Sequence, residues 1–410
     1  MSFKHLGLSD HLCDVLDHLG YEKATDIQAQ ALPEVLKGND VLGIAQTGTG
    51  KTGAFCLPIL ERLINDGTRA ESKKPAALIV APTRELVSQI LEETKRYVGS
   101  CRTRCSAVTG GVSQRPQERR LNKGVEVLVA TPGRLLDLAT NGHLDLSAVS
   151  YFVLDEADQL LDMGFIRDIR RIIKLLPKKR QSLLFSATMP KEVESLAHHI
   201  LHRPVQLKVT PQTITVEKIK QGYVSVNASD KQEALQCLLS KPEVRKSIVF
   251  TRTKHGANRV AQRLNKHGVC VEVIHGNKSQ NARNRALESF KSGHAWVLVA
   301  TDVAARGIDI QDVTHVINFD LPQEPESYVH RVGRTARAGA EGVAWSLVDR
   351  NEVSRLRKIE KLTKVKIRDV QLDLDGGDRG NTSDRIEKTQ ASKPRNRRRR
   401  RRGRAPKKAA

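Results

Sequence analysis

Short apolar runs rich in β-branched residues alternate along the chain with longer segments whose apolar residues recur every three or four positions. The short runs, at 40–44, 76–81, 125–130, 151–154 and 182–185, are typical of buried β-strands. The longer segments, at 52–65, 84–97 and 163–176, have the spacing of helices that cover a core. This alternation predicts βαβ units and a parallel sheet.

The same alternation begins again after residue 218, with strands expected at 247–250, 271–274, 297–300 and 313–318 and helices at 255–267, 281–292 and 327–334. The sequence Val-Leu-Val-Ala-Thr occurs in both halves, at 127–131 and at 297–301. We therefore predict an α/β protein with two parallel-sheet domains in tandem. The expected boundaries are 1–207 for the first domain, 208–217 for a linker, 218–368 for the second domain and 369–410 for a disordered tail.

A glycine-rich segment, AQTGTGKT at 45–52, follows the first predicted strand and opens a helix. Gly48 and Gly50 let backbone N–H groups approach phosphate oxygens, and the helix N-terminus adds partial positive charge. Lys51 would reach the β- and γ-phosphates, and the Thr52 hydroxyl would ligate Mg²⁺. The alternative is a glycine-rich turn without a ligand.

Three carboxylates, Asp155, Glu156 and Asp158, come directly after the apolar strand 151–154. At this place Asp155 would hold the metal ion, and Glu156 would orient or deprotonate the attacking water. Alone, the same residues could be a helix start with favourable dipole charges. Together with Lys51 they favour a site for ATP hydrolysis.

The formal net charge of +23 indicates a polyanionic partner, with membrane surfaces and acidic proteins as alternatives. Eleven of the positive charges lie between Lys393 and Lys408, where there is no acidic residue. We interpret this run as an RNA anchor; a solubilising tail and a targeting signal are the alternatives. The six cysteines form no zinc pattern, and the sequence has neither a signal peptide nor a long apolar segment, so we expect reduced thiols and a cytoplasmic protein with no membrane partner.

Asp155 to Asp158 spell DEAD, and the other motifs over residues 1–365 resemble those of the DEAD-box family in their order. In overall sequence character and in its basic tail the chain most resembles the bacterial RhlE-type subgroup. The resemblance implies two RecA-like domains and an ATP-dependent RNA helicase that uses ATP and Mg²⁺. It implies that Gln28 hydrogen-bonds adenine and that Phe3 stacks on it, although Phe3 could instead be a core residue. Ala24, Ala45 and Ala336 stand where the family or the generic motif has another residue.

The resemblance also assigns the remaining site residues. The nucleotide would be held by Thr47, Gly48, Thr49, Gly50, Lys51, Thr52 and Asp309, with Arg334 and Arg337 as arginine fingers and His330 paired with the acidic loop. Asp158, Ser186 and Thr188 would couple the nucleotide site to RNA binding. RNA would be contacted by Pro82, Thr83, Arg84, Gly110, Gly111, Thr131, Pro132, Gly133 and Arg134, and by Arg252, Gly276, Gln280, Arg283 and Thr301.

These RNA residues are hydroxyls, glycine amides and arginines, which grip phosphate and sugar, so little sequence specificity is expected. Preference for RNA over DNA needs a 2′-hydroxyl contact, which the sequence does not reveal. A DNA helicase, an ATP-gated RNA clamp and an RNA-binding protein with an inactive ATPase remain alternatives. Ribosomal precursors and RNA-decay machinery are the partners expected by analogy with the subgroup.

Overall fold

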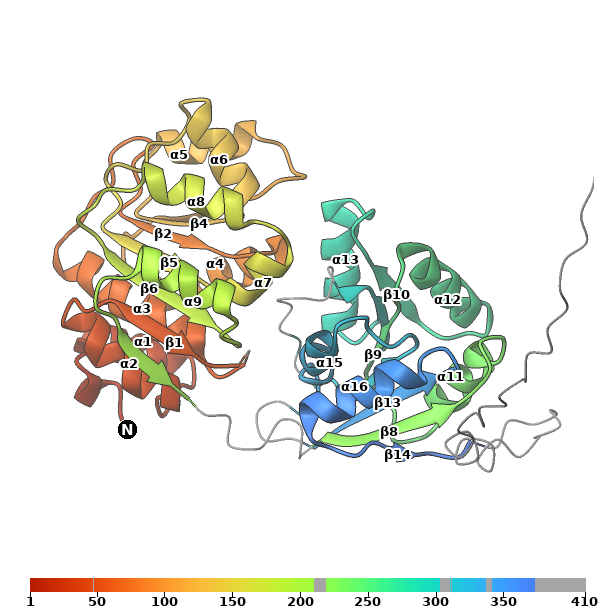
Figure 1. The fold of residues 1–410 in the computed structure, drawn as a ribbon. Coiled ribbons are helices and arrows are strands. Elements are labelled where there is room, and N and C mark those ends of the chain that lie inside the picture. Colours follow the sequence, from red (N-terminus) through yellow and green to blue (C-terminus); the bar gives the residue numbers. More distant parts are fainter. Residues whose placement is uncertain (47, 210–218, 303–309, 311, 337–340, 373–410) are drawn as a thin grey trace, which may run out of the picture. The chain divides into compact units, whose positions relative to one another are not determined.

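The computed structural model describes residues 1–46, 48–209, 219–302, 310, 312–336 and 341–372. It contains two all-parallel seven-stranded sheets, one built from the first half of the chain and one from the second (Figure 1). The predicted α/β class with two parallel sheets in tandem is confirmed. Among the described residues no helix is long and apolar enough to span a membrane.

The first sheet has the order β3-β4-β2-β5-β6-β1-β7. Its strands are β1 Val41–Ile44, β2 Ala77–Val80, β3 Cys105–Val108, β4 Val127–Ala130, β5 Tyr151–Leu154, β6 Gln181–Ser186 and β7 Val205–Lys208. Side chains alternate between its two faces, so Ala77 and Ile79 lie in one hydrophobic core while Leu78 and Val80 lie in another. β7 ends at Lys208, so the first residue of the predicted linker belongs to the sheet.

Helices cover both faces of this sheet (Figure 1). The first core is closed by η1 Lys4–Leu6, α1 Asp10–His18, α2 Asp26–Leu36, α3 Lys51–Asn65 and α4 Arg84–Val98. The second is closed by α5 Arg115–Asn122, α6 Pro132–Thr140, α7 Ala157–Asp162, α8 Ile166–Leu175 and α9 Lys191–Ile200. The helix expected over 163–176 starts only at Ile166, because Gly164 adopts a left-handed φ of 82° that ends the preceding turn.

The second sheet has the order β10-β11-β9-β12-β13-β8-β14. Its strands are β8 Ile219–Ser225, β9 Ser247–Phe250, β10 Val271–Ile274, β11 Val297–Ala300, β12 His315–Asn318, β13 Gly342–Val348 and β14 Arg368–Asp369. The helices are α11 Lys231–Leu239, α12 Lys254–Lys266, α13 Gln280–Lys291, α15 Pro325–Val332 and α16 Val353–Thr363. β12 starts at His315 and is therefore shorter than the predicted 313–318.

The two sheets have the same topology: β1 to β7 of the first sheet occupy the same places as β8 to β14, in that order, in the second. The repeated Val-Leu-Val-Ala sequence forms β4 in one sheet and β11 in the other, each the second strand from its edge. Because ligands of parallel α/β sheets bind at the carboxyl ends of strands, this topology groups the predicted site residues. In the first sheet the RNA motifs follow β3, β4 and β2, whereas the phosphate loop and the acidic motif follow β1 and β5.

Candidate functional site

The loop between β1 and α3 has the backbone of a phosphate cradle. Gly48 and Gly50 adopt left-handed φ angles of 86° and 91°, which side chains with a Cβ rarely tolerate. The Thr49 hydroxyl donates to the Gln46 carbonyl at 2.8 Å and closes the loop on itself. α3 then starts at Lys51, so its free N–H groups are available to an anion.

Lys51 is buried, with 6% of its surface exposed, yet its Nζ has no hydrogen-bond partner among the described residues. Burying an ammonium group without a hydrogen-bond partner costs free energy, and an anion beside the group offsets that cost. Asp155 lies close enough that Lys51 lowers its pKa, although burial raises the pKa of this carboxyl overall. The loop therefore offers a desolvated positive charge to a phosphate and, next to it, a carboxylate that needs a cation.

Glu156 is held in a strained conformation at the end of β5. Its φ and ψ of 50° and 53° lie in the left-handed region, and only 2% of its surface is exposed. Strain of this kind is concentrated at functional sites. Burial raises the pKa of Glu156, as does Asp155, whereas Lys51 and Arg334 act in the opposite direction. A raised pKa suits a carboxylate that accepts a proton from water.

The third carboxylate, Asp158, faces the loop after β6. Its Oδ2 accepts from the Thr188 backbone N–H at 2.9 Å and from the Thr188 hydroxyl at 2.8 Å. The Asp158 backbone N–H donates to the Ser186 hydroxyl at 3.3 Å. β5 and β6 are neighbours in the sheet, so the strand order itself brings the three predicted coupling residues together.

Gln28 contacts the phosphate loop. Its Nε2 donates to the Gly50 carbonyl at 3.1 Å, while its Oε1 accepts from the Thr25 backbone N–H at 3.0 Å and completes a capping box at the start of α2. A Cβ on Gly50 or Gly53 would overlap the Gln28 amide. Phe3 is only 4% exposed and lies in the first hydrophobic core. Adenine recognition by these two residues stays a prediction.

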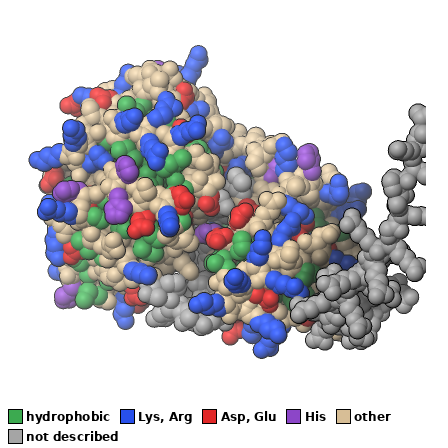
Figure 2. Space-filling view, viewed as in Figure 1, with side chains coloured by type: hydrophobic (Ala, Val, Ile, Leu, Met, Phe, Trp, Pro, Cys, Tyr) green, Lys and Arg blue, Asp and Glu red, His purple; other side chains and the backbone are tan. Residues whose placement is uncertain are grey.

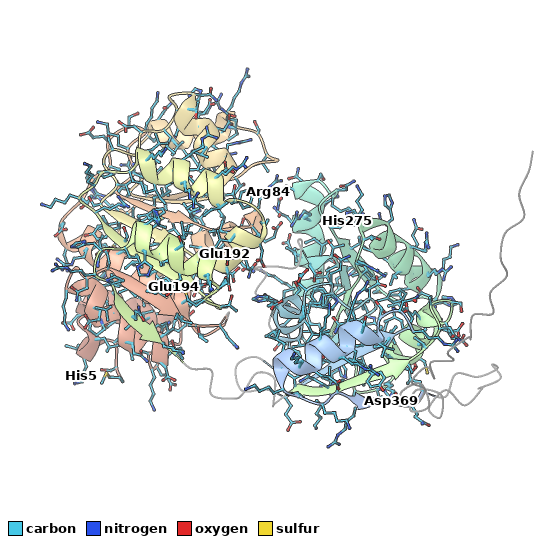
Figure 3. All side chains as sticks on the ribbon, viewed as in Figure 1. His5, Arg84, Glu192, Glu194, His275 and Asp369 are labelled. Atoms are coloured by element: carbon cyan, nitrogen blue, oxygen red, sulfur yellow. The ribbon has the colours of Figure 1, made fainter. Side chains whose placement is uncertain are left out.

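Several predicted RNA residues of the first sheet lie near Arg84, which is the first residue of α4 and is labelled in Figure 3. Thr83 caps this helix by accepting from the Leu86 N–H at 3.2 Å. The Arg84 guanidinium lies against Gly110 and Gly111, and a Cβ on Gly111 would overlap it. Burial and the neighbouring cations of Arg283 and Arg134 lower the pKa of Arg84, although Glu85 opposes them. Concentrated positive charge beside open glycine amides is suited to phosphate.

Two predicted RNA residues of the second sheet, Gln280 and Arg283, contact Glu85 on α4. Arg283 Nη2 lies 2.9 Å from Glu85 Oε2, and Gln280 Nε2 donates to Glu85 Oε1 at 2.9 Å. Gln280 Oε1 also accepts from Arg84 at 3.2 Å. Glu85 thus joins residues from both halves of the chain, a role that the sequence did not reveal. Gly276, Thr301 and Arg252 follow β10, β11 and β9, which are adjacent strands.

The sequence is similar over most of its length to known proteins. The DEAD-box ATP-dependent RNA helicase CshA of Geobacillus kaustophilus is 45% identical over 366 residues, which cover 89% of this chain and 77% of the relative. The chain belongs to the DEAD-box ATP-dependent RNA helicase family. CshA of Bacillus subtilis is 44% identical over 367 residues, covering 90% of this chain and 73% of that protein.

Family and structural comparisons agree with this assignment. Residues 25–196 match the DEAD/DEAH box helicase family, and residues 230–339 match the helicase conserved C-terminal domain. Saccharomyces cerevisiae Dbp5 bound to RNA and ADP BeF3 is similar with a TM-score of 0.82 and 34% identity, covering 95% of this chain and 98% of that one. The DEAD-box helicase Mss116 bound to ssRNA and UDP-BeF has a TM-score of 0.82 and 29% identity, covering 90% and 79%. Both sheets are therefore RecA-like, as expected.

In this DEAD-box protein the segment 330–337, which contains His330 and the predicted arginine fingers, has two arginines among its described residues, Arg331 and Arg334. Their surroundings differ. Arg334 is 4% exposed, and its Nε donates to the His330 carbonyl at 3.1 Å. Arg331, to which the sequence analysis gave no role, forms two bonds to Asp302 at 2.5 and 2.8 Å and donates to the Asp320 carbonyl at 2.7 Å. Arg331 therefore ties the segments after β11 and β12 together beneath the motif.

A buried charge cluster behind Arg252 also escaped the sequence analysis. Lys231, 3% exposed, lies 2.5 Å from Glu352 and 3.8 Å from Asp320. Asp320 in turn accepts from the Arg252 backbone N–H at 2.9 Å. Lys231, Asp320 and Glu352 lie far apart in sequence, and none of them belongs to a predicted motif. Their contact therefore becomes visible only in the folded structure. Thr47, Asp309, Arg337, most of the linker and the tail from 373 onward lie outside the described residues.

Proposed function

We propose that this chain hydrolyses ATP in response to RNA and uses the cycle to separate short RNA duplexes or to remodel RNA–protein complexes. The observation that carries this proposal is the buried Lys51 ammonium, without a partner among the described residues, beside the buried carboxylates of Asp155 and Glu156. A polyphosphate would supply an anion to Lys51, and a cation would balance the two carboxylates. The similarity to Dbp5 bound to RNA and ADP BeF3, and to Mss116 bound to ssRNA and UDP-BeF, supports the same assignment.

Each residue in the phosphate site has a distinct task. Lys51 and the N–H groups of the glycine-rich loop bind and orient the phosphates. Glu156 accepts or orients the proton of the attacking water, and its raised pKa favours this role. Arg334 supplies positive charge to the transferring phosphoryl group, which the first sheet provides only through Lys51.

The donor set also fits Mg²⁺, a hard cation that prefers oxygen ligands. Asp155 is almost fully buried and burial raises its pKa, so its ionised form needs a nearby cation. Asp155 and the Thr52 hydroxyl would hold the ion. When bound, it would neutralise phosphate charge.

RNA would be held by its backbone along the residues that follow β3, β4 and β2 and those that follow β10, β11 and β9. The predicted contacts are glycine amides, hydroxyls and arginines, so we expect little sequence specificity. The predicted domains, 1–207 and 218–368, each end one residue before a strand does, because β7 ends at Lys208 and β14 at Asp369. We therefore propose domains at 1–208 and 218–369. The relatives reported above carry the name CshA and lend no support to an RhlE-type subgroup; ribosomal precursors and RNA-decay machinery remain candidate partners by analogy.

The proposal is tested by replacing Arg334. We expect Arg334→Ala to retain ATP binding but to lose RNA-stimulated hydrolysis by about three orders of magnitude. Nucleotide binding and steady-state turnover should be measured with RNA and with DNA of one sequence, and unwinding with matched duplexes. Arg350→Ala, at an exposed arginine, is the control. Parent-like turnover in the Arg334 variant would exclude the finger, and equal unwinding of both duplexes would indicate a general helicase.

A further inference from the structure

The exposed side of α8 is a continuous basic stripe. Arg167, Arg170, Arg171 and Lys174 are exposed and recur at helical spacing, so they lie along one side of the helix. The opposite side carries Ile169 and Ile172, which are fully buried in the second core of the first sheet. Lys178 and Lys179 extend the positive charge beyond the helix end. We call these six residues the α8 stripe.

The charges of the stripe are poorly neutralised. Asp168, the acidic residue of α8, lies 3.9 Å from Arg171. The structure shows no side-chain hydrogen bond or ion pair for Arg167, Arg170 or Lys174 to any other described residue. Like charges held together on one face repel one another and are favourable only with an anionic partner or in free solvent. Basic residues that are scattered over a surface need only solvent. Whether the α8 stripe binds an anionic partner instead is therefore judged from its position.

The stripe lies next to the predicted RNA track. α8 packs beside α6, on the same face of the first sheet, and basic side chains stand out on this part of the surface (Figures 1 and 2). A hollow of about 430 Å³ is lined by both helices, from Gly133 on α6 to Arg171 on α8, with the carboxylates of Asp137 and Asp168 also in its lining. α6 itself begins at Pro132, within the segment 131–134 that is expected to grip RNA. A backbone held at Gly133 therefore has the stripe within reach.

We propose that the α8 stripe binds the phosphates of an RNA segment that continues beyond the strand gripped at 131–134. This inference rests on the proposed function, because it extends the same RNA track. An anchor outside the core grip would keep a structured RNA on the protein while the core binds and releases a single strand, raising its effective concentration.

The chemistry of the stripe argues for RNA over a membrane. A helix that lies on a membrane exposes an apolar face, whereas the apolar face of α8 is buried in the core. Its exposed apolar side chain, Leu175 at 46%, is too little to insert. Guanidinium groups are well suited to phosphate oxygens, which they contact bidentately.

The experiment compares two RNAs on the full-length protein: a short oligouridylate, and the same strand extended by a hairpin. The test variant is Arg167→Gln/Arg170→Gln/Lys174→Gln, which removes three cations without breaking an ion pair that the structure shows. The control is Lys95→Gln/Arg96→Gln/Arg102→Gln, which removes three exposed cations near the carboxyl end of α4, whereas the predicted RNA residues Thr83 and Arg84 lie at the other end of this helix. Of these three cations, Arg96 forms an exposed ion pair, 3.5 Å from Glu93. Affinity is measured at several salt concentrations.

For the parent and the control we expect the hairpin to increase affinity over the short strand. For the test variant this gain should fall by about tenfold at low salt, with a log–log salt slope for the extended RNA shallower by about 2, or 0.7 per lost phosphate contact. A full gain in the test variant, or an equal loss in the control, would overturn the proposal and leave the stripe to an acidic protein or to solvent. RNA-stimulated ATP turnover of the parent, measured separately, tells whether the proposed function itself has failed.

Discussion

Thr188 donates both its backbone N–H and its hydroxyl to a single carboxylate oxygen of Asp158, at 2.9 and 2.8 Å. Asp158 lies in α7, which follows β5, and Thr188 lies in the loop after the neighbouring strand β6. The Ser186 hydroxyl, which donates to the Thr188 carbonyl at 2.7 Å, fixes the same loop. The buried acidic motif and the loop after β6 are therefore joined directly by hydrogen bonds.

Removing the Thr188 hydroxyl should weaken this connection without removing a catalytic group. Thr188→Val keeps the shape of the side chain and the backbone hydrogen bond, but loses a bond to a charged acceptor worth about 1.5–3 kcal/mol. We expect duplex unwinding to fall by roughly tenfold or more, while ATP turnover falls much less. Thr188→Ser, which retains the hydroxyl, is the matched control. Equal losses of unwinding and turnover in the valine variant would rule out a coupling role.

Substitutions of Gln28 can separate its predicted role in adenine recognition from its structural role in capping α2. One of its bonds caps α2 and the other reaches the Gly50 carbonyl. A Gln amide that presents a donor and an acceptor matches the amino group and N7 of adenine but not the guanine edge. We expect Gln28→Ala to weaken ATP use, to narrow the ratio of ATP to GTP turnover and to destabilise the fold by about 1 kcal/mol through the lost cap.

Gln28→Glu serves as the control, because its carboxylate can still cap α2 but cannot donate to Gly50. Because Gln28 is buried and faces the Gly50 carbonyl, the new carboxylate should lower stability for a reason other than a lost cap. Loss of nucleotide discrimination in both variants therefore cannot be attributed to the cap. Steady-state hydrolysis of both nucleotides and the urea midpoint of unfolding provide the two readouts. An ATP/GTP ratio equal to that of the parent in both variants would remove Gln28 from the adenine site.

The sequence was sufficient to predict those parts of the site that consist of neighbouring residues in one loop. The glycine-rich loop, the acidic motif and the strand–helix alternation each occupy a continuous segment, so their geometry follows from local rules. The repeat at 127–130 and 297–300 even indicated equivalent strands, and both occupy the same place in their sheets. Helix starts were less predictable, as at Ile166, where a glycine with positive φ delays the helix.

Contacts between distant segments could not be predicted from one sequence. Lys231 and Glu352 are separated by 121 positions, and neither belongs to a motif that the sequence analysis recognised. Arg331 lies inside a recognised motif, yet its burial against Asp302 became visible only when β11 and β12 were placed. In both cases charged residues, normally exposed, are buried because the fold supplies partners for every charge.

The Lys231–Glu352 pair should be costly to break from one side. Lys231→Met removes the shorter ion pair of the Glu352 carboxylate, which is 1% exposed, and leaves it the longer one to Arg355 at 3.4 Å. We expect a loss of about 3–5 kcal/mol in the free energy of unfolding. Lys231→Met/Glu352→Gln removes the charge as well but keeps an acceptor for the Leu321 N–H that Glu352 now binds at 3.1 Å. The double variant should regain much of the loss in denaturant titrations. If it is no more stable than Lys231→Met, the carboxylate was not the source of the cost.

His315 should make the second sheet sensitive to mild acid. It lies on β12 with 2% of its surface exposed, its ring 4.8 Å from that of Trp345. Its Nε2 is buried and has no hydrogen-bond partner among the described residues. Burial lowers the pKa of His315, and Lys241 acts in the same direction, whereas Glu243 opposes them. The folded protein therefore takes up this proton less readily than the unfolded chain does.

The sign of the effect follows from this difference. At a pH above the ordinary value of about 6.5, histidine is neutral in both states and costs nothing. As the pH falls from there towards the lower pKa of the folded state, the unfolded chain binds the proton first and stability is lost. His315→Phe keeps a ring against Trp345 and removes the titration. We expect urea midpoints of the parent to fall more steeply than those of the variant between about pH 6.5 and 5, with other histidines cancelling in the difference. Midpoints of the two proteins that change in parallel over this range would show that His315 is not the sensitive group.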